Sequence, residues 1–208
     1  DIERHFRVVA GPGAGKTYWL VNHIKQVVAR SKRLSPASRI ACISYTNVAV
    51  HEIVTQLGSA ATKVDASTIH SFLYRNVVRP YLHLLRDGDD QPLVEFASVD
   101  GHDEHHPSYP IVDEWLRSIG QAKILQQTFE EQRAILNDKL RQLVWQRSVD
   151  GEWTLGPRKP DRMGKMLNAI FTSSNLIDYK RRYWRLGIVD HEDILYFAHR
   201  ILEEHPLV

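Results

Sequence analysis

The chain has 208 residues, of which 43% are hydrophobic and 25% are charged, so it is long enough to bury a substantial core. Its formal net charge of +2 neither requires nor excludes a nucleic-acid partner. The single cysteine, Cys42, excludes an internal disulfide and a multi-cysteine zinc site, and its apolar neighbours predict a buried thiol. No apolar run approaches the ~20 residues of a membrane-spanning helix and no signal-peptide pattern is present, so we expect a soluble, cytoplasmic chain without a membrane partner. Because the first residue is Asp1 rather than Met, we expect the numbering to begin inside a longer protein.

Short apolar runs alternate with amphipathic helical stretches in the first third of the chain. Strands are predicted over residues 6–10, 40–45 and 63–67, with a helix after each of the first two. This alternation is typical of a parallel α/β sheet. Each helix has one apolar face that can pack on the sheet. The two faces consist of Leu20, Val21, Ile24, Val27 and Val28, and of Ala49, Val50, Ile53 and Leu57.

Strand signals fade beyond about Tyr74, and the rest of the chain is predicted to be helical. Helical patterns cover residues 77–85, with a bend at Pro80, and residues 115–145. Between them, residues 86–110 are rich in Asp, Gly, His and Pro and predict an exposed acidic loop, ordered or disordered. A second break, over residues 150–160, precedes a basic helix that ends at residues 180–185.

A glycine-rich segment lies between the first predicted strand and the first predicted helix, which is the setting of a phosphate-binding loop. It consists of Ala10, Gly11, Pro12, Gly13, Ala14, Gly15, Lys16 and Thr17. Its glycines let successive backbone N–H groups point at phosphate oxygens, and the helix N-terminus adds a favourable dipole. Lys16 would neutralise the β- and γ-phosphates of a nucleotide and the Thr17 hydroxyl would hold Mg²⁺, so both are candidate catalytic residues. The loop alone does not choose among kinases, GTPases, transporters and helicases, and ATP with Mg²⁺ as cofactors follows from the family resemblance below. The alternative is an ordinary glycine-rich turn.

Two further strands end in small polar residues at the start of a helix. Tyr45, Thr46 and Asn47 follow the second strand, and residues 68–72 repeat the design one strand later. Because the carboxyl ends of parallel strands meet at one sheet edge, we expect these polar side chains on the same edge.

In this order, the motifs resemble those of the UvrD/Rep-like superfamily 1 DNA helicases, which include RecB-like helicase-nuclease subunits. Gly15-Lys16-Thr17 is similar to the first family motif. Tyr45-Thr46-Asn47, with Ala49 and Glu52, is similar to its Phe-Thr-Asn-Lys-Ala-Ala motif, and Thr68-Ile69-His70-Ser71-Phe72 to its Thr-Phe-His-Ser motif. Residues 187–195 are similar to its Asp-Phe-x-Asp-Leu-Leu segment. The motifs cover the N-terminal third and the last twenty or so residues, and the middle matches in length and helical character.

The resemblance implies a RecA-like P-loop NTPase domain with an α-helical insert. Residues 1–73 would begin the ATP-binding domain, 74–186 would form the insert with its acidic loop at 86–110, and 187–208 would return to the first domain and end before the acidic Walker B strand. The implied activity is an ATP-dependent DNA helicase or translocase, moving 3′ to 5′, that acts in repair, recombination or defence. The implied partners are single-stranded and duplex-junction DNA, with a nuclease or other protein subunit as a further possibility. The fragment alone should bind nucleotide weakly, if at all, and should be inactive as an ATPase.

The resemblance also assigns residue roles. The nucleotide would contact the phosphate loop and Tyr18, which stands where the family has an Arg beside the adenine. DNA would contact Tyr45, Thr46, Asn47, Thr68, His70 and Ser71. Departures from the family pattern are Tyr45 for Phe, which can still stack on a base, Val48 for Lys, and Ile69 for Phe.

Several residues allow a second interpretation. Asn47 could only cap its helix, Tyr45 could be a core aromatic, and His70 could be structural. The histidines at 102, 105 and 106, with Asp103 and Glu104, fit a solvated run better than a metal site. The basic run at 180–185 fits either a solvated helix face or a phosphate track. The sequence Asp113-Glu114 matches the Asp-Glu pair of a catalytic acidic strand, but it lies at the start of a helical stretch. We therefore interpret the match as a coincidence.

Of three alternative functions, two remain open at this point. The nearest is the motor subunit of a helicase-nuclease or of a phage-defence system. A degenerate motor that serves as an ATP-gated DNA-binding module is the non-enzyme alternative. A small-molecule kinase would need a substrate-binding acid or an arginine lid near the loop, and the sequence offers neither.

Overall fold

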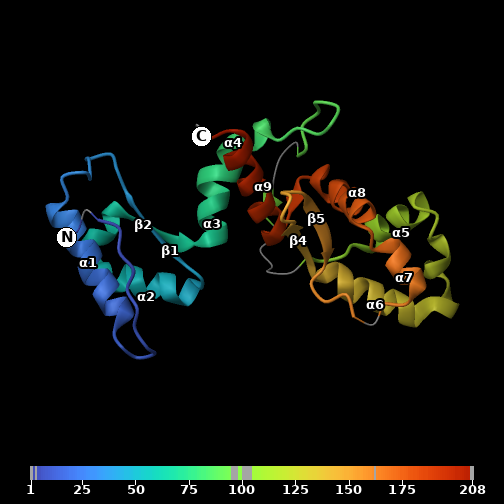
Figure 1. Ribbon diagram of the computed structural model, residues 1–208, viewed down its shortest axis with the longest axis horizontal. Coiled ribbons are helices and arrows are strands. Elements are labelled where there is room, and N and C mark those ends of the chain that lie inside the picture. Colours follow the sequence, from blue (N-terminus) through green and yellow to red (C-terminus); the bar gives the residue numbers. More distant parts are fainter. Residues whose placement is uncertain (1, 3, 95–97, 100–104, 162, 207–208) are drawn as a thin grey trace. The chain divides into compact units, whose positions relative to one another are not determined.

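The structure is a computed structural model, which describes residues 2, 4–94, 98–99, 105–161 and 163–206. The chain divides into two compact units, Asp1–Phe72 and Leu73–Val208, hereafter unit 1 and unit 2 (Figure 1). Residues 187–208, predicted to return to the first domain, are grouped with unit 2. No described helix is both long and apolar enough to cross a membrane.

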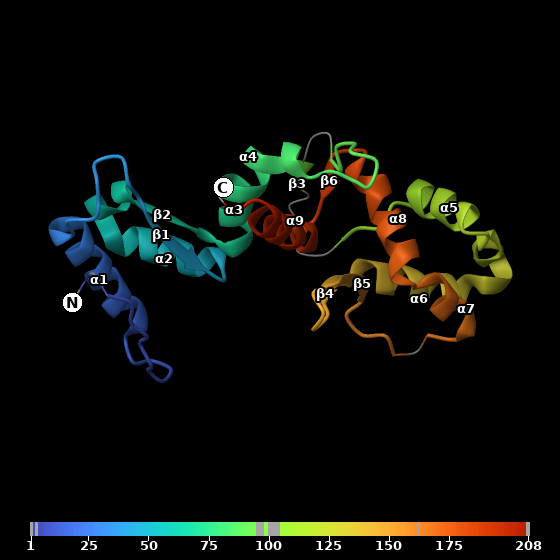
Figure 2. The same cartoon turned by 45° about the horizontal axis from the view of Figure 1, so that its top comes forward.

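Unit 1 contains a small parallel sheet with helices on one face (Figures 1 and 2). The elements are α1 (Lys16–Arg30), β1 (Ile40–Ser44), α2 (Asn47–Leu57), a 3₁₀ helix (Gly58–Lys63), β2 (Val64–Thr68) and α3 (Ile69–Leu73). Strands β1 and β2 pair in parallel from Ile40↔Val64 to Ser44↔Thr68, which confirms both predicted strands and their parallel pairing.

The core of unit 1 lies between this sheet and its two longer helices. Cys42 and Val64 project from the same face of the sheet, as their register requires, and both are buried. They pack against Val21 and Ile24 of α1 and against Ile53 and Leu57 of α2. The helical faces predicted from the sequence therefore supply the buried residues, and the prediction of a buried Cys42 is confirmed.

The predicted strand over residues 6–10 is wrong. None of these residues pairs with a strand among the described residues, and Val9 is 82% exposed. A strand needs a neighbouring strand to satisfy its backbone N–H and C=O groups. Contacts with α1 hold this segment instead, because the Phe6 ring lies 5.2 Å from the Trp19 ring and 4.7 Å from the His23 ring, between centroids.

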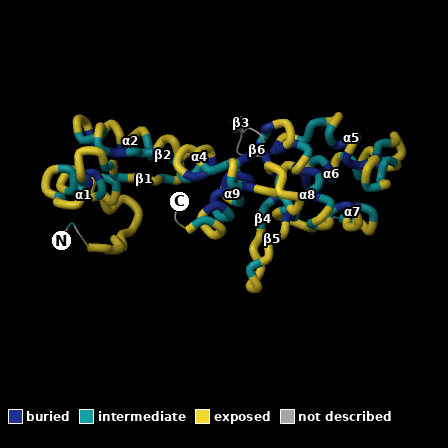
Figure 3. Tube along the Cα trace, turned by 90° about the horizontal axis from the view of Figure 1, so that it is seen from above, coloured by how far each residue is buried: buried dark blue, intermediate teal, exposed yellow. Residues whose placement is uncertain are grey.

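Unit 2 is built mainly of short helices. A π-helical turn (Tyr74–Val78), α4 (Arg79–Tyr81) and a 3₁₀ turn (Leu82–Leu84) cover the predicted helix around Pro80, which has no N–H to continue a regular ladder. The longer helices are α5 (Tyr109–Ser118), α6 (Glu130–Arg141), α7 (Lys165–Ile170), α8 (Ser173–Trp184) and α9 (His191–Glu204). Buried positions, dark blue in Figure 3, occur in each of these helices.

The predicted helix over residues 115–145 is interrupted. Helix α5 ends at Ser118, and Gly120 follows with φ of 71°, a left-handed conformation that commonly terminates helices. Two 3₁₀ turns, Ala122–Leu125 and Gln127–Phe129, then lead to α6. One continuous helix is therefore replaced by two helices with an irregular connection.

The prediction that unit 2 is all-helical is also wrong. Strands β4 (Leu143–Arg147) and β5 (Trp153–Pro157) form an antiparallel hairpin, and β3 (Ser98–Val99) pairs in parallel with β6 (Ile188–Val189). The break predicted over residues 150–160 is the hairpin turn followed by β5. Leu143 and Leu155 are buried in the larger core of unit 2.

The acidic loop predicted at residues 86–110 is partly buried. Its first part folds into a turn in which the Leu93 N–H donates to the Leu85 carbonyl at 2.9 Å and the Asp87 carboxylate accepts N–H bonds from Asp89 and Gln91. Leu93 is buried at the end of this turn. The expectation of a wholly exposed loop is therefore wrong for this part, while residues 95–97 and 100–104 lie outside the described residues.

Candidate functional site

The phosphate loop curls tightly before α1. Gly13 and Gly15 have φ of 73° and 71°, a region that residues with a Cβ rarely adopt. A Cβ at either position would meet no atom within 4 Å, so backbone conformation rather than lack of space requires glycine. The Ala14 N–H donates to the Gly11 carbonyl at 3.4 Å and closes the turn.

The Lys16 side chain lies back across this loop. Its Nζ donates to the carbonyl of Ala10 at 3.1 Å and to that of Gly11 at 2.6 Å. No side chain among the described residues caps the start of α1, and the first turn of α1 contains no acidic residue. The helix N-terminus therefore offers backbone N–H groups and a positive dipole end beside an ammonium group, which together favour an anion.

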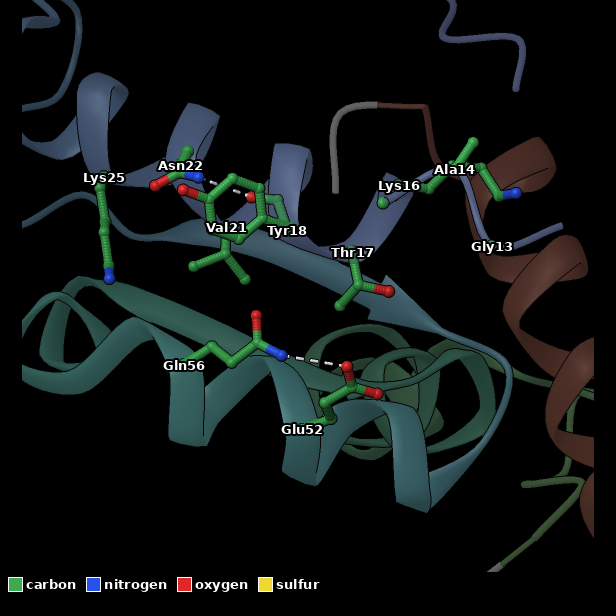
Figure 4. Close-up of a pocket in the computed structure, with 11 residues that line it drawn as sticks. Gly13, Ala14, Lys16, Thr17, Tyr18, Val21, Asn22, Lys25, Glu52 and Gln56 are labelled. Atoms are coloured by element: carbon green, nitrogen blue, oxygen red, sulfur yellow. Dashed lines mark hydrogen bonds between the residues drawn. The ribbon is translucent and has the colours of Figure 1, made fainter. Parts of the chain in front are cut away.

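A cavity of about 650 Å³ opens beside the loop, within the size range of ligand sites. It is lined by the loop and by residues of α1 and α2, shown in Figure 4: Gly13, Ala14, Gly15, Lys16, Thr17, Tyr18, Val21, Asn22, Lys25, Glu52 and Gln56. Thr17 lies on the side of the cavity that faces Glu52 (Figure 4). Glu52 accepts a hydrogen bond from Gln56 Nε2 at 3.0 Å.

Five of these residues were not predicted to line a nucleotide site: Val21, Asn22, Lys25, Glu52 and Gln56. Asn22 and Lys25 follow Tyr18 on one face of α1, and Gln56 follows Glu52 by one turn of α2. A helical projection from Tyr18 and Glu52 would have found them, since residues four apart share a face. Only the packing of α1 beside α2 reveals that the two faces border one cavity.

Tyr18 is 70% exposed at this cavity. The backbone carbonyl of Tyr18 accepts a hydrogen bond from Asn22 Nδ2 at 3.0 Å. An exposed ring in this position can cover the face of a flat heterocycle.

The polar segments that follow β1 and β2 lie at the same sheet edge, because Ser44 pairs with Thr68 in the register. Tyr45 is 89% exposed, so the interpretation of it as a core aromatic is wrong. Thr46 caps α2, with its Oγ1 accepting from the Ala49 N–H at 3.2 Å. Asn47 is the exposed first residue of α2 rather than its cap, so the capping interpretation of Asn47 is also wrong.

Thr68 and Ser71 are tied to each other at the start of α3. The Thr68 hydroxyl donates to Ser71 Oγ at 3.0 Å and accepts from the Ser71 N–H at 3.3 Å. His70, between them, is half-buried and has interactions of its own. The segment after β2 is thus held by hydrogen bonds among its own residues, whereas Tyr45 in the segment after β1 is exposed.

The pair Asp113-Glu114 lies in α5, as predicted. Asp113 accepts from Arg117 Nε at 2.9 Å and Nη2 at 3.1 Å, and these bonds lower the pKa of its carboxyl group. Glu114 forms an ion pair with Arg182. Both carboxylates therefore serve ion pairs on helices of unit 2.

The interpretation of the histidine run as solvated is wrong for His105. His105 is buried, with Nε2 at 2.8 Å from the Tyr179 hydroxyl and Nδ1 at 3.2 Å from Asp190 Oδ2. Burial lowers its pKa, although the hydrogen bond to Asp190 opposes the shift. No group of metal-ligating side chains occurs in the part of the chain that the structure describes, and residues 102–104 lie outside it.

Lys180, at the start of the basic run, belongs to the same buried cluster. Its ammonium group pairs with Asp190 and, at 2.9 Å, with Asp193. Asp190 and Asp193 also form a capping box at the start of α9. Both interpretations offered for the run are therefore wrong at Lys180, which joins α8 to α9 inside the core.

Comparison with known proteins agrees with the mixed α/β fold. The family model of the UvrD/REP helicase N-terminal domain matches residues 2–208. The Gabija protein GajB of Bacillus cereus (strain HuB5-5) is 40% identical over 67 residues, a match that covers 31% of this chain and 10% of GajB. Because the family model spans nearly the whole chain, the protein belongs to the UvrD/REP helicase N-terminal domain family.

Proposed function

We propose that this chain is the first, RecA-like motor domain of an ATP-dependent DNA helicase or translocase, with residues 74–186 as its helical insert. The observation that carries the proposal is the phosphate loop itself. An ammonium group and an uncapped helix N-terminus meet at one edge of a cavity large enough for a nucleotide. Family membership supports the assignment of that nucleotide as ATP and of its partner as DNA.

In this proposal Lys16 releases the loop carbonyls to which it now donates and bonds instead to the triphosphate. Ala10, Gly11, Pro12, Gly13, Ala14 and Gly15 wrap the phosphates, and the ring of Tyr18 covers the base. Thr17 fits a Mg²⁺ ligand because its side chain borders the cavity beside the loop. When bound, the metal ion would neutralise phosphate charge.

DNA would lie along the carboxyl edge of the β1–β2 sheet. The exposed ring of Tyr45 provides a stacking surface for a base, and Asn47 provides an exposed amide. Three hydroxyl groups also lie near this edge: that of Thr46, which caps α2, and those of Thr68 and Ser71, which bond to each other at the start of α3. His70 lies between Thr68 and Ser71 in the sequence. A 3′ to 5′ direction and roles in repair, recombination or defence are parts of the proposal that rest on the family alone.

Nucleotide binding tests the proposal directly in this chain. We expect a fluorescent ATP analogue with Mg²⁺ to bind weakly, and Lys16→Ala to weaken binding at least tenfold further because the phosphates lose a charge-assisted bond to the ammonium group. Lys123→Ala removes an equal charge from an exposed position in unit 2 and should leave affinity unchanged. Equal affinities of the wild-type chain and Lys16→Ala would contradict the proposed site.

A further inference from the structure

A second cavity, of about 330 Å³, lies wholly in unit 2 between the turn at 86–93, α8 and α9. Its charged lining residues are Arg86, Asp87, Arg181 and Arg200. Its walls also include Leu93, Ile177, Trp184 and Tyr196. Three guanidinium groups and one carboxylate line the cavity, and Glu204 outside the lining pairs with Arg200, so an excess of positive charge remains.

The elements around this cavity hold two of the arginines in place. Arg86 donates through Nη1 to the Asp90 carbonyl at 3.0 Å. Arg200 donates to Glu204 at 2.7 and 3.2 Å, and its guanidinium lies 5.8 Å from the centroid of the Tyr196 ring. A guanidinium has five N–H donors, so each of these side chains keeps donors for a ligand.

Arg181 differs from the other two arginines. It is exposed on α8, and no hydrogen bond from its side chain to any described residue is found. It acts electrostatically on Asp87, whose carboxylate also accepts N–H bonds from Gln91 and Asp89. These backbone bonds, with the charges of Arg181 and Arg185, lower the pKa of Asp87, and its carboxylate lines the same cavity as Arg181.

We propose that this cavity binds a phosphoryl group, carried by a nucleic-acid backbone or by a free phosphate compound. Arginine forks match the oxygens of phosphate, and the small volume suits one phosphorylated unit. The group would take Arg181 as its main partner and displace that side chain from its interaction with Asp87. The site lies in unit 2, outside the phosphate loop, and does not rest on the proposed ATP function.

The test uses the chain with Lys16→Ala, so that the phosphate loop contributes little. The probes are inorganic pyrophosphate, measured by calorimetry, and a fluorescein-labelled single-stranded oligonucleotide, measured by anisotropy over a salt series. We expect Arg181→Ala to weaken binding about fivefold and to reduce the salt slope for the oligonucleotide by about 0.7. Arg141→Ala removes the same charge from an exposed position of α6 and should change neither quantity.

A second variant should strengthen binding, which a damaged fold would not do. Asp87→Asn removes the competing charge and keeps an oxygen to accept the N–H bonds of Asp89 and Gln91, so we expect tighter binding of the probe that Arg181→Ala weakens. Effects limited to pyrophosphate identify a free phosphate compound, and effects limited to the oligonucleotide identify a nucleic-acid backbone. Binding of neither probe, equal effects of Arg181→Ala and Arg141→Ala, or an unchanged affinity in Asp87→Asn would overturn the proposal. Nucleotide binding by the chain without Lys16→Ala reports separately on the ATP site.

Discussion

At the scale of single residues, Tyr45 is the clearest candidate for contact with a base. Its ring is 89% exposed, so it contributes little to folding, and base stacking on an aromatic ring stabilises binding by about 1–3 kcal/mol. We predict that Tyr45→Ala weakens single-stranded DNA binding roughly 5- to 150-fold, while Tyr45→Phe keeps it, as measured by anisotropy.

The control for this prediction is another exposed tyrosine. Tyr109 is 65% exposed at the start of α5, and Tyr109→Ala should leave DNA affinity unchanged. A loss of affinity in Tyr45→Phe equal to that in Tyr45→Ala would show that the hydroxyl, rather than stacking, is responsible.

His105 makes stability depend on pH. Burial lowers the pKa of His105 in the folded chain. In the unfolded chain the side chain has its ordinary pKa of about 6.5. Below about pH 6.5 the unfolded chain therefore binds more protons at His105 than the folded chain does. Stability contributed by neutral His105 is therefore present above about pH 6.5 and is lost as pH falls through the lower folded pKa. We predict that urea unfolding from pH 8 to pH 5 shows this loss, and that His105→Gln reduces it.

Comparing the pH profile of the wild-type chain with that of His105→Gln separates the effect of His105 from the effects of the other histidines. The partners of its ring are Tyr179 and Asp190, and a glutamine amide can still bond to them without titrating. Parallel pH profiles of the wild-type chain and His105→Gln would mean that His105 does not cause the dependence.

At the scale of elements, the cap of α2 supports the edge on which Tyr45 lies. Thr46 Oγ1 accepts the Ala49 N–H at 3.2 Å. Loss of such a cap typically costs about 1 kcal/mol, so Thr46→Ala should lower the free energy of unfolding by that amount, while Thr46→Ser should retain most of it. Urea titration followed by circular dichroism measures both, and equal stability of the two variants would contradict the capping role.

The β4–β5 hairpin depends on a glycine in its turn. Gly151 has φ of 88°, which a residue with a Cβ adopts at a cost of about 1–3 kcal/mol. We predict that Gly151→Ala lowers the free energy of unfolding by that amount. Gly156 lies in β5 of the same hairpin, and a Cβ added there would have no atom within 4 Å. Gly156→Ala should therefore lower the free energy of unfolding much less. Comparable losses in both would contradict the backbone explanation.

Elements with local signals could be predicted from the sequence, and those that depend on distant contacts could not. Strands β1 and β2 follow from short apolar runs, and α1 and α2 from helical periodicity. The β4–β5 hairpin was missed because Leu143, Val144 and Trp145 also fit the helical pattern of the preceding residues. The strand expected at residues 6–10 fails because apolar residues alone do not supply a pairing partner.

At the scale of the whole molecule, sequence motifs located the candidate site better than they located the core of unit 2. Phosphate-loop residues are contiguous, so their chemistry can be recognised from order alone. The partners of Lys180 lie ten and thirteen residues further along the chain, and only the packing of α8 against α9 makes them a buried ion cluster. The arginine cavity likewise combines the turn at 86–93 with two helices far along the sequence.

We propose that this domain belongs to a motor driven by ATP and DNA. The most direct measurement is ATP turnover by the protein that carries this chain, with and without single-stranded DNA, beside Lys16→Ala. We predict strong stimulation by DNA that disappears in Lys16→Ala. Turnover that is indifferent to DNA, or that persists in Lys16→Ala, would contradict a motor function.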